Sequence, residues 1–305
     1  MRVTEVAARS KNADLEALLL GFLGVLTFSF SLPATRLAAP ELGGLFVGLA
    51  RALVAATLAG LLLLARGEKL PARTHWKSLA VVALGVVIGF PVFSSLALVH
   101  VPAMHGTVIS GLLPAATALM GVLLARERPP LAFWLWTLAG VGAILVFAAL
   151  EGAGTPTLAD GYFLVAVLLA GMGYAEGAKL ARALEGWRTI CWALVLAAPF
   201  LVLPVALLAR DLHGVSTQAW LGLGYVSVFS MFLGFFPWYR ALAQGGIARV
   251  SPIQMSQPML SLIWSALVLH EALSPRVVVF GVLITAIAWF TRQAAVRPPP
   301  SAMSN

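Results

Sequence analysis

The few side chains that could bind a polar ligand interrupt long apolar runs. The stretch SPIQMSQP carries Ser251, Gln254 and Gln257, and the two glutamines are three residues apart. Residues at that spacing share one face of a helix. A glutamine that cannot reach water must find a polar partner. We expect Gln254, and after it Gln257 and Ser251, to contact a ligand; the alternative is an interhelical hydrogen bond worth about 0.6–2 kcal/mol.

Arg51 is the one cation in the middle of an apolar run, FVGLARALVAA. An ionisable side chain inside a membrane is by default a functional hypothesis. The planar guanidinium could hold a carboxylate with two parallel hydrogen bonds. The structural alternative pairs Arg51 with freed backbone carbonyls or with Glu176. Glu176 itself is either a proton-coupling group or the partner of Lys179, three residues along the chain.

Other polar and aromatic residues are weaker candidates for the same site. Ser110 aligns with Gln254 in the repeat described below, and Thr107 and His105 precede it by about one turn. A histidine at a helix end is more often simply solvated, so His105 as a ligand for substrate or a proton is the less favoured alternative. Aromatic side chains could stack on an aromatic substrate or pack an aliphatic one, with ordinary packing as the alternative; the candidates are Phe28, Phe90, Tyr174 and Trp264.

Catalytic and metal-binding patterns are missing from the sequence. It contains no GxSxG, no HExxH and no paired aspartates inside an apolar run, and the five histidines lie near the ends of such runs. The single cysteine, Cys191, cannot form an intramolecular disulfide. We therefore predict that the protein is not an enzyme and carries no metal and no cofactor.

The composition indicates a membrane protein. Hydrophobic residues make up 60% of the 305 residues and charged residues 10%, against about 45–50% and about 25% in soluble domains. The net charge of +8 comes from short basic clusters between apolar runs. No continuous basic patch results, so we expect the lipid bilayer and a small molecule as partners, and no nucleic acid.

The apolar runs predict an all-α polytopic protein with ten transmembrane helices, because a helix needs about 20 apolar residues to cross a bilayer. With the N-terminus inside, 16 lysines and arginines fall on the cytoplasmic side and 3 on the other. The positive-inside rule then places both termini in the cytoplasm. The predicted spans are 15–35, 42–65, 78–98, 104–125, 131–150, 160–181, 189–209, 218–239, 248–270 and 275–292.

Two segments far apart in the chain resemble each other. ISGLLPAATALMGVLLARE starts at Ile109 and IQMSQPMLSLIWSALVLHE at Ile253, so their matching prolines and glutamates lie 144 residues apart. Five helices form an odd number, so the second half would enter the membrane inverted, as in many secondary transporters. We predict a cytoplasmic tail over 1–14, repeats over 15–150 and 151–292, and a second cytoplasmic tail over 293–305.

Six prolines within the apolar runs predict helix breaks. Proline removes the hydrogen bond to the carbonyl four residues earlier, and in a bilayer only protein or a water-filled cavity can satisfy that group. The freed carbonyls could bind an ammonium group; plain bending of helices is the alternative. The prolines are Pro33, Pro91, Pro114, Pro237, Pro252 and Pro258. Glu127 and Glu271, which end the repeated segments, are expected to hold helix ends or gate contacts.

The repeated P…E helix, the opening FSFSLPATRLA and the following FVGLARALVAA resemble the drug/metabolite transporter superfamily, in its EamA-type branch. The resemblance covers about 15–292 and is closest to the bacterial aromatic amino acid exporters. It implies an inner-membrane exporter of aromatic and other neutral amino acids, working as a monomer by alternating access. The alternatives are export of another small metabolite or drug, or a channel-like facilitator.

Overall fold

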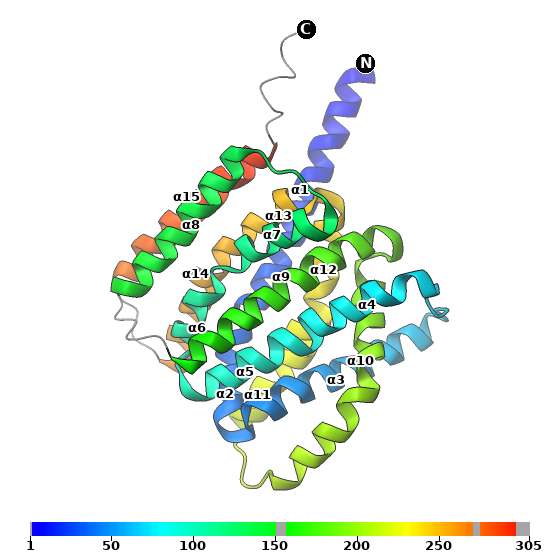
Figure 1. The fold of residues 1–305 in the computed structure, drawn as a ribbon, viewed down its shortest axis with the longest axis vertical. Helices are drawn as coiled ribbons and strands as arrows, with labels where there is room; N and C mark the ends of the chain where they lie inside the picture. The colour runs from blue at the N-terminus through cyan, green and yellow to red at the C-terminus, as the bar shows by residue number, and fades with distance from the viewer. Residues whose placement is uncertain (1, 151–156, 271–274, 297–305) are drawn as a thin grey trace.

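The computed structural model describes residues 2–150, 157–270 and 275–296, and every element in these ranges is helical (Figure 1). The all-helical prediction is therefore confirmed. The first half comprises α1 (Arg2–Ser29), α2 (Ser31–Leu42), α3 (Gly44–Ala65), η1 (Arg73–His75), α4 (Trp76–Val82), η2 (Ala83–Gly89), α5 (Phe90–His100), α6 (Ala103–Ser110), α7 (Leu113–Ala125) and α8 (Leu131–Leu150). The second comprises α9 (Leu158–Leu184), α10 (Gly186–Leu208), η3 (Ala209–Asp211), α11 (Thr217–Tyr225), η4 (Val226–Leu233), α12 (Phe235–Gly245), α13 (Ile247–Val250), η5 (Ser251–Ser256), α14 (Gln257–Leu269) and α15 (Pro275–Val296).

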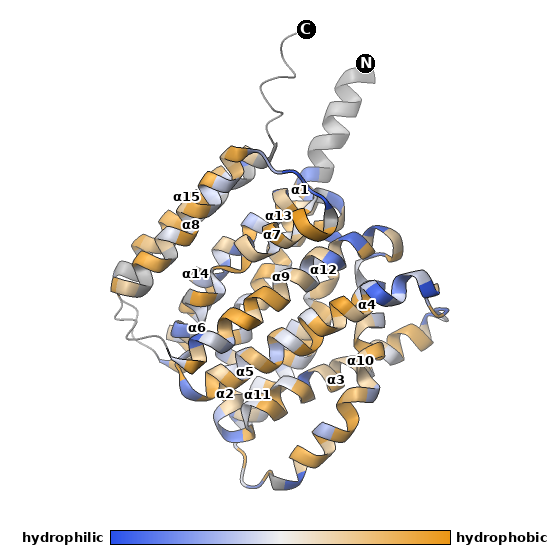
Figure 2. Cartoon of the chain, in the orientation of Figure 1, coloured by the Kyte–Doolittle hydropathy of each residue, from blue (hydrophilic) through white to orange (hydrophobic). Residues whose placement is uncertain are grey.

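Six segments of the described chain are long and apolar enough to cross a membrane. They correspond to the first, second, third, sixth, seventh and eighth predicted spans, and their bounds are Asp14–Leu42, Gly44–Ala65, Arg73–His100, Leu158–Leu184, Gly186–Leu208 and Thr217–Gly245. Figure 2 shows hydrophobic residues along the helices and hydrophilic residues at several helix ends and connections. Many large apolar side chains face outward, among them Leu64 at 80% and Phe200 at 74% exposure, as lipid contact requires.

Several helices change type or break at corresponding places in the two halves. The π-helices η2 and η4 begin at residues 83 and 226, which are 143 residues apart. Helix α6 gives way to α7 through a turn after Ser110, and the 3₁₀-helix η5 precedes α14. Arg126 and His270, which directly follow α7 and α14, both take the left-handed conformation with φ 55°.

The six prolines named above all lie within the first turn of a helical segment that follows such a change. Proline is tolerated there because the first N–H groups of a helix have no partner within it. Pro33 is near the start of α2, Pro91 of α5, Pro114 of α7, Pro237 of α12, Pro252 of η5 and Pro258 of α14. The carbonyl of Ser29, opposite Pro33, accepts a hydrogen bond of 2.5 Å from Ser261 Oγ, so protein rather than ligand satisfies it.

Small residues bring the central helices close together. A Cβ on Gly48 of α3 would lie 2.6 Å from the Cα of Val92 in α5, and one on Gly85 of η2 would lie 2.8 Å from the Cα of Gly173 in α9. Helix α3 also packs against α10, α1 against α12, and α9 against both α5 and α7. Helices α8 and α15 pack on each other at the edge of the bundle (Figure 1). The centre of the bundle is therefore enclosed by helices from both halves of the chain.

Candidate functional site

A small cavity lies at the centre of the bundle. Its volume is about 20 Å³, enough for about one water molecule. Five of the residues predicted to bind substrate line it: Phe28, Arg51, Phe90, Tyr174 and Gln257. The other lining residues are Ser31, Leu32, Val86, Leu113, Ala170, Ser230, Met231 and Phe235. One wall is thus polar and cationic and the remainder is apolar, which suits a ligand with an anionic head and an apolar tail.

Arg51 dominates the polar wall. Its side chain is almost completely buried, and residue exposure is 2%. Its Nη2 donates to Ser31 Oγ at 3.3 Å and to Ser230 Oγ at 3.1 Å, and these two hydroxyl oxygens are 2.9 Å apart. Its Nε has no hydrogen-bond partner among the described residues. A guanidinium in this setting is a buried cation with only neutral neighbours and at least one free donor.

Glu176 does not supply the missing negative charge. Its carboxylate accepts a hydrogen bond from Ser78 and pairs with Lys179 Nζ at 3.2 Å. This arrangement matches the ion-pair alternative for Glu176 at the end of α9. The pairing of Glu176 with Arg51, the structural alternative from sequence, is not found among the described contacts.

Two serines in the Arg51 network were not selected from the sequence. Ser31 begins α2 directly after the turn at Phe30, and Ser230 lies in the π-helix η4. Both hydroxyls face Arg51 because the regular α-helix is interrupted beside them. The sequence signal that could have found them is a small polar residue within a few positions of a proline or glycine break.

The polar residues of the ninth predicted span divide into two groups. Gln257 lines the cavity, and its Oε1 has no partner. Gln254 is 1% exposed, and neither its Oε1 nor its Nε2 has a partner among the described residues, but it is not part of this cavity's wall. Ser251 and Ser110 are likewise buried with unpartnered hydroxyls outside the wall. The glutamine pair is therefore split, with only Gln257 facing the cavity.

The remaining predicted residues have partners elsewhere. His105 Nε2 pairs with Asp160 of α9, and Thr107 Oγ1 donates to the carbonyl of Ala103 at 2.9 Å within its own helix. Trp264 Nε1 donates to Ser29 Oγ at 3.0 Å. None of the three lines the central cavity. Within the described chain, no group of three histidine, cysteine or carboxylate side chains could hold a metal ion.

Five aromatic side chains, which we call the aromatic plug, close one side of the cavity: Phe28, Tyr174, Phe235, Trp238 and Tyr239. The ring centroids of Phe28 and Phe235 are 5.0 Å apart, and those of Tyr174 and Trp238 are 5.5 Å apart. Tyr239 stacks obliquely on Phe235 at 5.2 Å, and its hydroxyl donates to the carbonyl of Gly173 at 3.1 Å. The plug is held from three helices and is almost completely buried.

A larger pocket lies beyond the plug, toward the end of the bundle with the basic connections. Its volume is about 810 Å³. Leu20 precedes the cavity residue Phe28 on α1, Leu62 follows Arg51 on α3, and Ala181 follows Tyr174 on α9, each in the direction of that end. On α12, Phe236 and Pro237 come directly after the cavity residue Phe235. The lining residues are Leu20, Leu62, Arg66, Ala181, Glu185, Gly186, Trp187, Phe236, Pro237, Arg240, Ala243 and Gln244. We call this pocket the vestibule.

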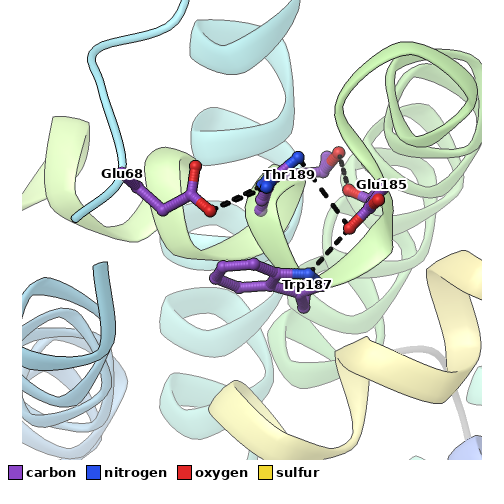
Figure 3. A network of polar contacts seen from close by, with 5 residues as sticks. Glu68, Glu185, Trp187 and Thr189 are labelled. Carbon is purple, nitrogen blue, oxygen red and sulfur yellow. Dashed lines mark hydrogen bonds and ion pairs between the residues drawn. The ribbon is translucent and has the colours of Figure 1, made fainter. Parts of the chain in front are cut away.

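A polar network stands beside the vestibule at the start of α10 (Figure 3). Arg188 donates to Glu68 Oε1 from Nε at 3.0 Å and from Nη2 at 2.7 Å, which ties α10 to the connection after α3. Trp187 Nε1 donates to Glu185 Oε2 at 2.9 Å, and the Arg66 guanidinium lies 5.9 Å from the Trp187 ring centroid. These contacts fix the rim of the vestibule.

The opposite end of the bundle is held together by different contacts. Arg36 Nη1 donates to the carbonyls of Leu98 at 2.6 Å and Val99 at 3.1 Å, which joins α2 to the end of α5. The His105–Asp160 pair joins α6 to α9, and the Asp160 carboxylate also caps the start of α9. The central cavity is thus closed toward this end by helix contacts and toward the vestibule by aromatic rings.

Glu127 holds a helix end, as the sequence predicted for such a residue. Its Oε1 accepts from the N–H of Ile247 and its Oε2 from the N–H of Ala248, both at 2.9 Å. The carboxylate therefore caps α13 from a position 120 residues away and suits the positive end of the helix dipole. Glu271, its counterpart in the repeat, lies outside the described residues.

The model of the EamA-like transporter family matches residues 15–149 and again residues 157–292. The chain belongs to the EamA-like transporter family. It is a multi-pass membrane transporter of the drug/metabolite superfamily, so the superfamily and the transport role predicted from sequence are confirmed.

Individual relatives agree with the family. Uncharacterized transporter YdeK of Bacillus subtilis (strain 168) is 47% identical over 266 residues, covering 87% of this chain and 92% of the relative. An uncharacterized transporter of Archaeoglobus fulgidus is 27% identical over 217 residues, covering 68% of this chain and 75% of its own. A crystal structure with 20% sequence identity has the same fold, with a TM-score of 0.70 over 92% of this chain and 97% of the other.

Proposed function

We propose that this EamA-family protein is an inner-membrane secondary transporter that exports neutral amino acids, aromatic ones foremost, by alternating access. The observation that carries the proposal is the buried guanidinium of Arg51, which faces the central cavity and has no negative partner among the described residues. An α-carboxylate supplies that partner. The apolar wall of Val86, Phe90 and Leu113 suits the side chain of a neutral amino acid.

The proposal includes ten spans in two inverted halves, 15–150 and 151–292, with both termini in the cytoplasm. If the halves are exchanged, α1 corresponds to α9, α5 to α12 and α7 to α14. The contact of α1 with α12 then becomes that of α9 with α5, and the contact of α7 with α9 becomes that of α14 with α1; all four are present. The pairs α3–α10 and α8–α15 map onto themselves. These exchanges support a twofold relation between the halves, and the distribution of basic residues supports the orientation.

In the proposed bound state the substrate carboxylate contacts Arg51 Nε and a terminal nitrogen, and the ammonium contacts Gln257 Oε1. The cavity of about 20 Å³ is too small for an amino acid, so binding requires it to widen. Separation of the aromatic plug would open the cavity to the vestibule, on the side we propose is cytoplasmic. Release of Arg36 from Leu98 and Val99 would open the other side.

Gln254 stays a proposed contact for the widened state. Its amide is buried with both polar atoms unpartnered, so it can hydrogen-bond a substrate without first breaking another bond. The hydroxyls of Ser110 and Ser251 are likewise buried without a hydrogen-bond partner among the described residues. His105 and Thr107 would take part only if their present partners were released.

Counterflow in proteoliposomes tests the function. Vesicles with purified protein are loaded with unlabelled phenylalanine, and uptake of labelled phenylalanine is followed, with threonine, lysine and a cationic dye as competitors. We expect saturable exchange of neutral amino acids, and a loss of at least tenfold in Arg51→Gln. Arg73→Gln, which removes an exposed arginine at the start of η1, away from the cavity wall, is the matched control. Exchange of the dye but no amino acid would overturn the proposed substrate, and unsaturable flux would favour a channel-like facilitator.

A further inference from the structure

We propose that the central site takes apolar monocarboxylates that lack an ammonium group at least as well as it takes zwitterionic amino acids. The inference rests on the proposed function, because it treats the central cavity as the substrate site. It concerns which groups of the substrate that site recognises: the carboxylate and the apolar tail, and not the amine.

The charges on the cavity wall give the first argument. Arg51 is the one ionisable group on the wall that is charged at neutral pH, and no aspartate or glutamate is among the lining residues. Its neighbours Ser31 and Ser230 are neutral, and Nε remains free. A monoanion therefore makes the site neutral overall. A zwitterion brings a second cation into a space that already holds a buried one.

The acceptors available to an ammonium group give the second argument. An ammonium has three donors, and burial of a charge is costly unless it is paired and hydrogen-bonded. Apart from the hydroxyls of Ser31 and Ser230, which already bond Arg51, the side chains of the wall offer two neutral acceptors, Gln257 Oε1 and the hydroxyl of Tyr174. The nearby carbonyl of Ser29, which Pro33 frees, is already bonded to Ser261 Oγ at 2.5 Å. Recognition of the amine is therefore poor, whereas recognition of the carboxylate is strong.

The hydroxyls beside Arg51 strengthen this asymmetry. Ser31 and Ser230 lie 2.9 Å apart, and both accept from Arg51 Nη2. Their oxygens thus hold the guanidinium in place, and their protons can turn toward a carboxylate oxygen. At the offset of 143 residues that relates η2 to η4, Ser230 corresponds to Val87 and Ser31 to Tyr174, so the pair of serines does not recur. The site therefore has one cationic subsite, which can bind an anion, and the rest of its wall is apolar.

The apolar remainder defines the tail of the acid. Val86, Phe90 and Leu113 face the cavity together with the plug residues Phe28 and Phe235. These side chains can pack an aryl or branched alkyl group, and none of them can solvate a second charge. The class is therefore aryl- or alkyl-substituted monocarboxylates, with dicarboxylates and amines excluded.

Calorimetric titration of the purified full-length protein in detergent tests the inference with three probes of one shape. The probes are L-phenylalanine, 3-phenylpropionate, which lacks the amine, and 2-phenylethylamine, which lacks the carboxylate. We expect 3-phenylpropionate to bind as tightly as phenylalanine within threefold, or more tightly, and the amine to bind at least tenfold more weakly. Arg51→Gln should lose at least tenfold for both carboxylates, with Arg73→Gln as the control.

The outcomes separate the two proposals. Phenylalanine binding with an acid more than threefold weaker would overturn the inference and leave amino acid transport standing. Binding of the amine as tight as that of the acid would also overturn it, because Arg51 would not then be the recognising group. If none of the three probes binds, the proposed function and the inference fall together. The wild-type series decides the question even if the Arg51 variant does not fold.

Discussion

Glu185, in the connection from α9 to α10, has backbone angles that favour glycine. Its φ is 69° and its ψ is 156°, a region almost restricted to glycine, where another residue costs about 1–3 kcal/mol. The comparable connection from α2 to α3 has Gly43, with φ 82° and ψ 134°. The Glu185 side chain is 64% exposed and bonds only Trp187, apart from a 3.9 Å approach to Arg188.

Comparison of Glu185→Gly with Glu185→Ala isolates the backbone strain, because both variants lose the same side-chain contacts. Glycine relieves about 1–3 kcal/mol of strain and costs about 0.5–1 kcal/mol more conformational entropy than alanine on folding. Glu185→Gly should therefore be more stable than Glu185→Ala by about 1 kcal/mol at the middle of the two ranges, and by up to about 2.5 kcal/mol. The reverse change, Gly43→Ala, should destabilise the protein although a Cβ there meets nothing within 4 Å.

Thermal unfolding of the purified proteins in one detergent, followed by tryptophan fluorescence, measures the difference. A domain of this size shifts by a few degrees per kcal/mol, so we expect the glycine variant to unfold about 1–5 °C above the alanine variant. Equal midpoints, or a higher midpoint for Glu185→Ala, would refute the argument that this residue is strained. Gly43→Ala unfolding at the wild-type temperature would refute it for the first half.

Three further changes test other parts of the structure. Glu127→Ala leaves two N–H groups of α13 without their acceptors and should cost about 2–4 kcal/mol, while Glu127→Gln, which keeps one acceptor oxygen, should cost less; equal midpoints for the two would contradict the capping role. Gly48→Ala should destabilise by about 1–3 kcal/mol because its Cβ meets backbone of α5, whereas Gly60→Ala on the same helix, whose nearest neighbour is 3.8 Å away, should be neutral or stabilising. Gln254→Ala should lower phenylalanine counterflow several-fold at unchanged membrane abundance, and wild-type flux in that variant would remove Gln254 from the site.

The sequence was informative where a residue type is rare in its surroundings. Arg51 is conspicuous inside an apolar run because a charge is costly there, and it does face the central cavity. The six prolines marked helix breaks because proline has no backbone N–H to donate, and all of them lie in the first turn of a helical segment. Such arguments depend on the local chain and need no tertiary information.

The sequence was less informative about partners that meet across the fold. Ser31 and Ser230 are 199 residues apart in the chain, yet their hydroxyls lie 2.9 Å from each other. Serines are common in membrane helices, and the local sign that set these two apart was their place within a few positions of a proline or glycine break. The spacing of Gln254 and Gln257 suggested a shared face, but that argument assumes one regular helix. Gln254 belongs to a 3₁₀ segment and Gln257 begins α14.

The π-helices η2 and η4 allow the chain to lose one residue before each of two cavity residues without turning the helix that follows. A π-helical segment accommodates an additional residue within an α-helix. Deletion of one residue from Ala83–Gly89 would let the segment revert to α-helix, and Phe90 would keep its place on the cavity wall; a deletion in Val226–Leu233 would likewise leave Phe235 in place. A deletion in the regular helix α3 would instead rotate every residue beyond it by about 100°. The two π-helices are therefore the places where the chain tolerates a change of length beside the cavity.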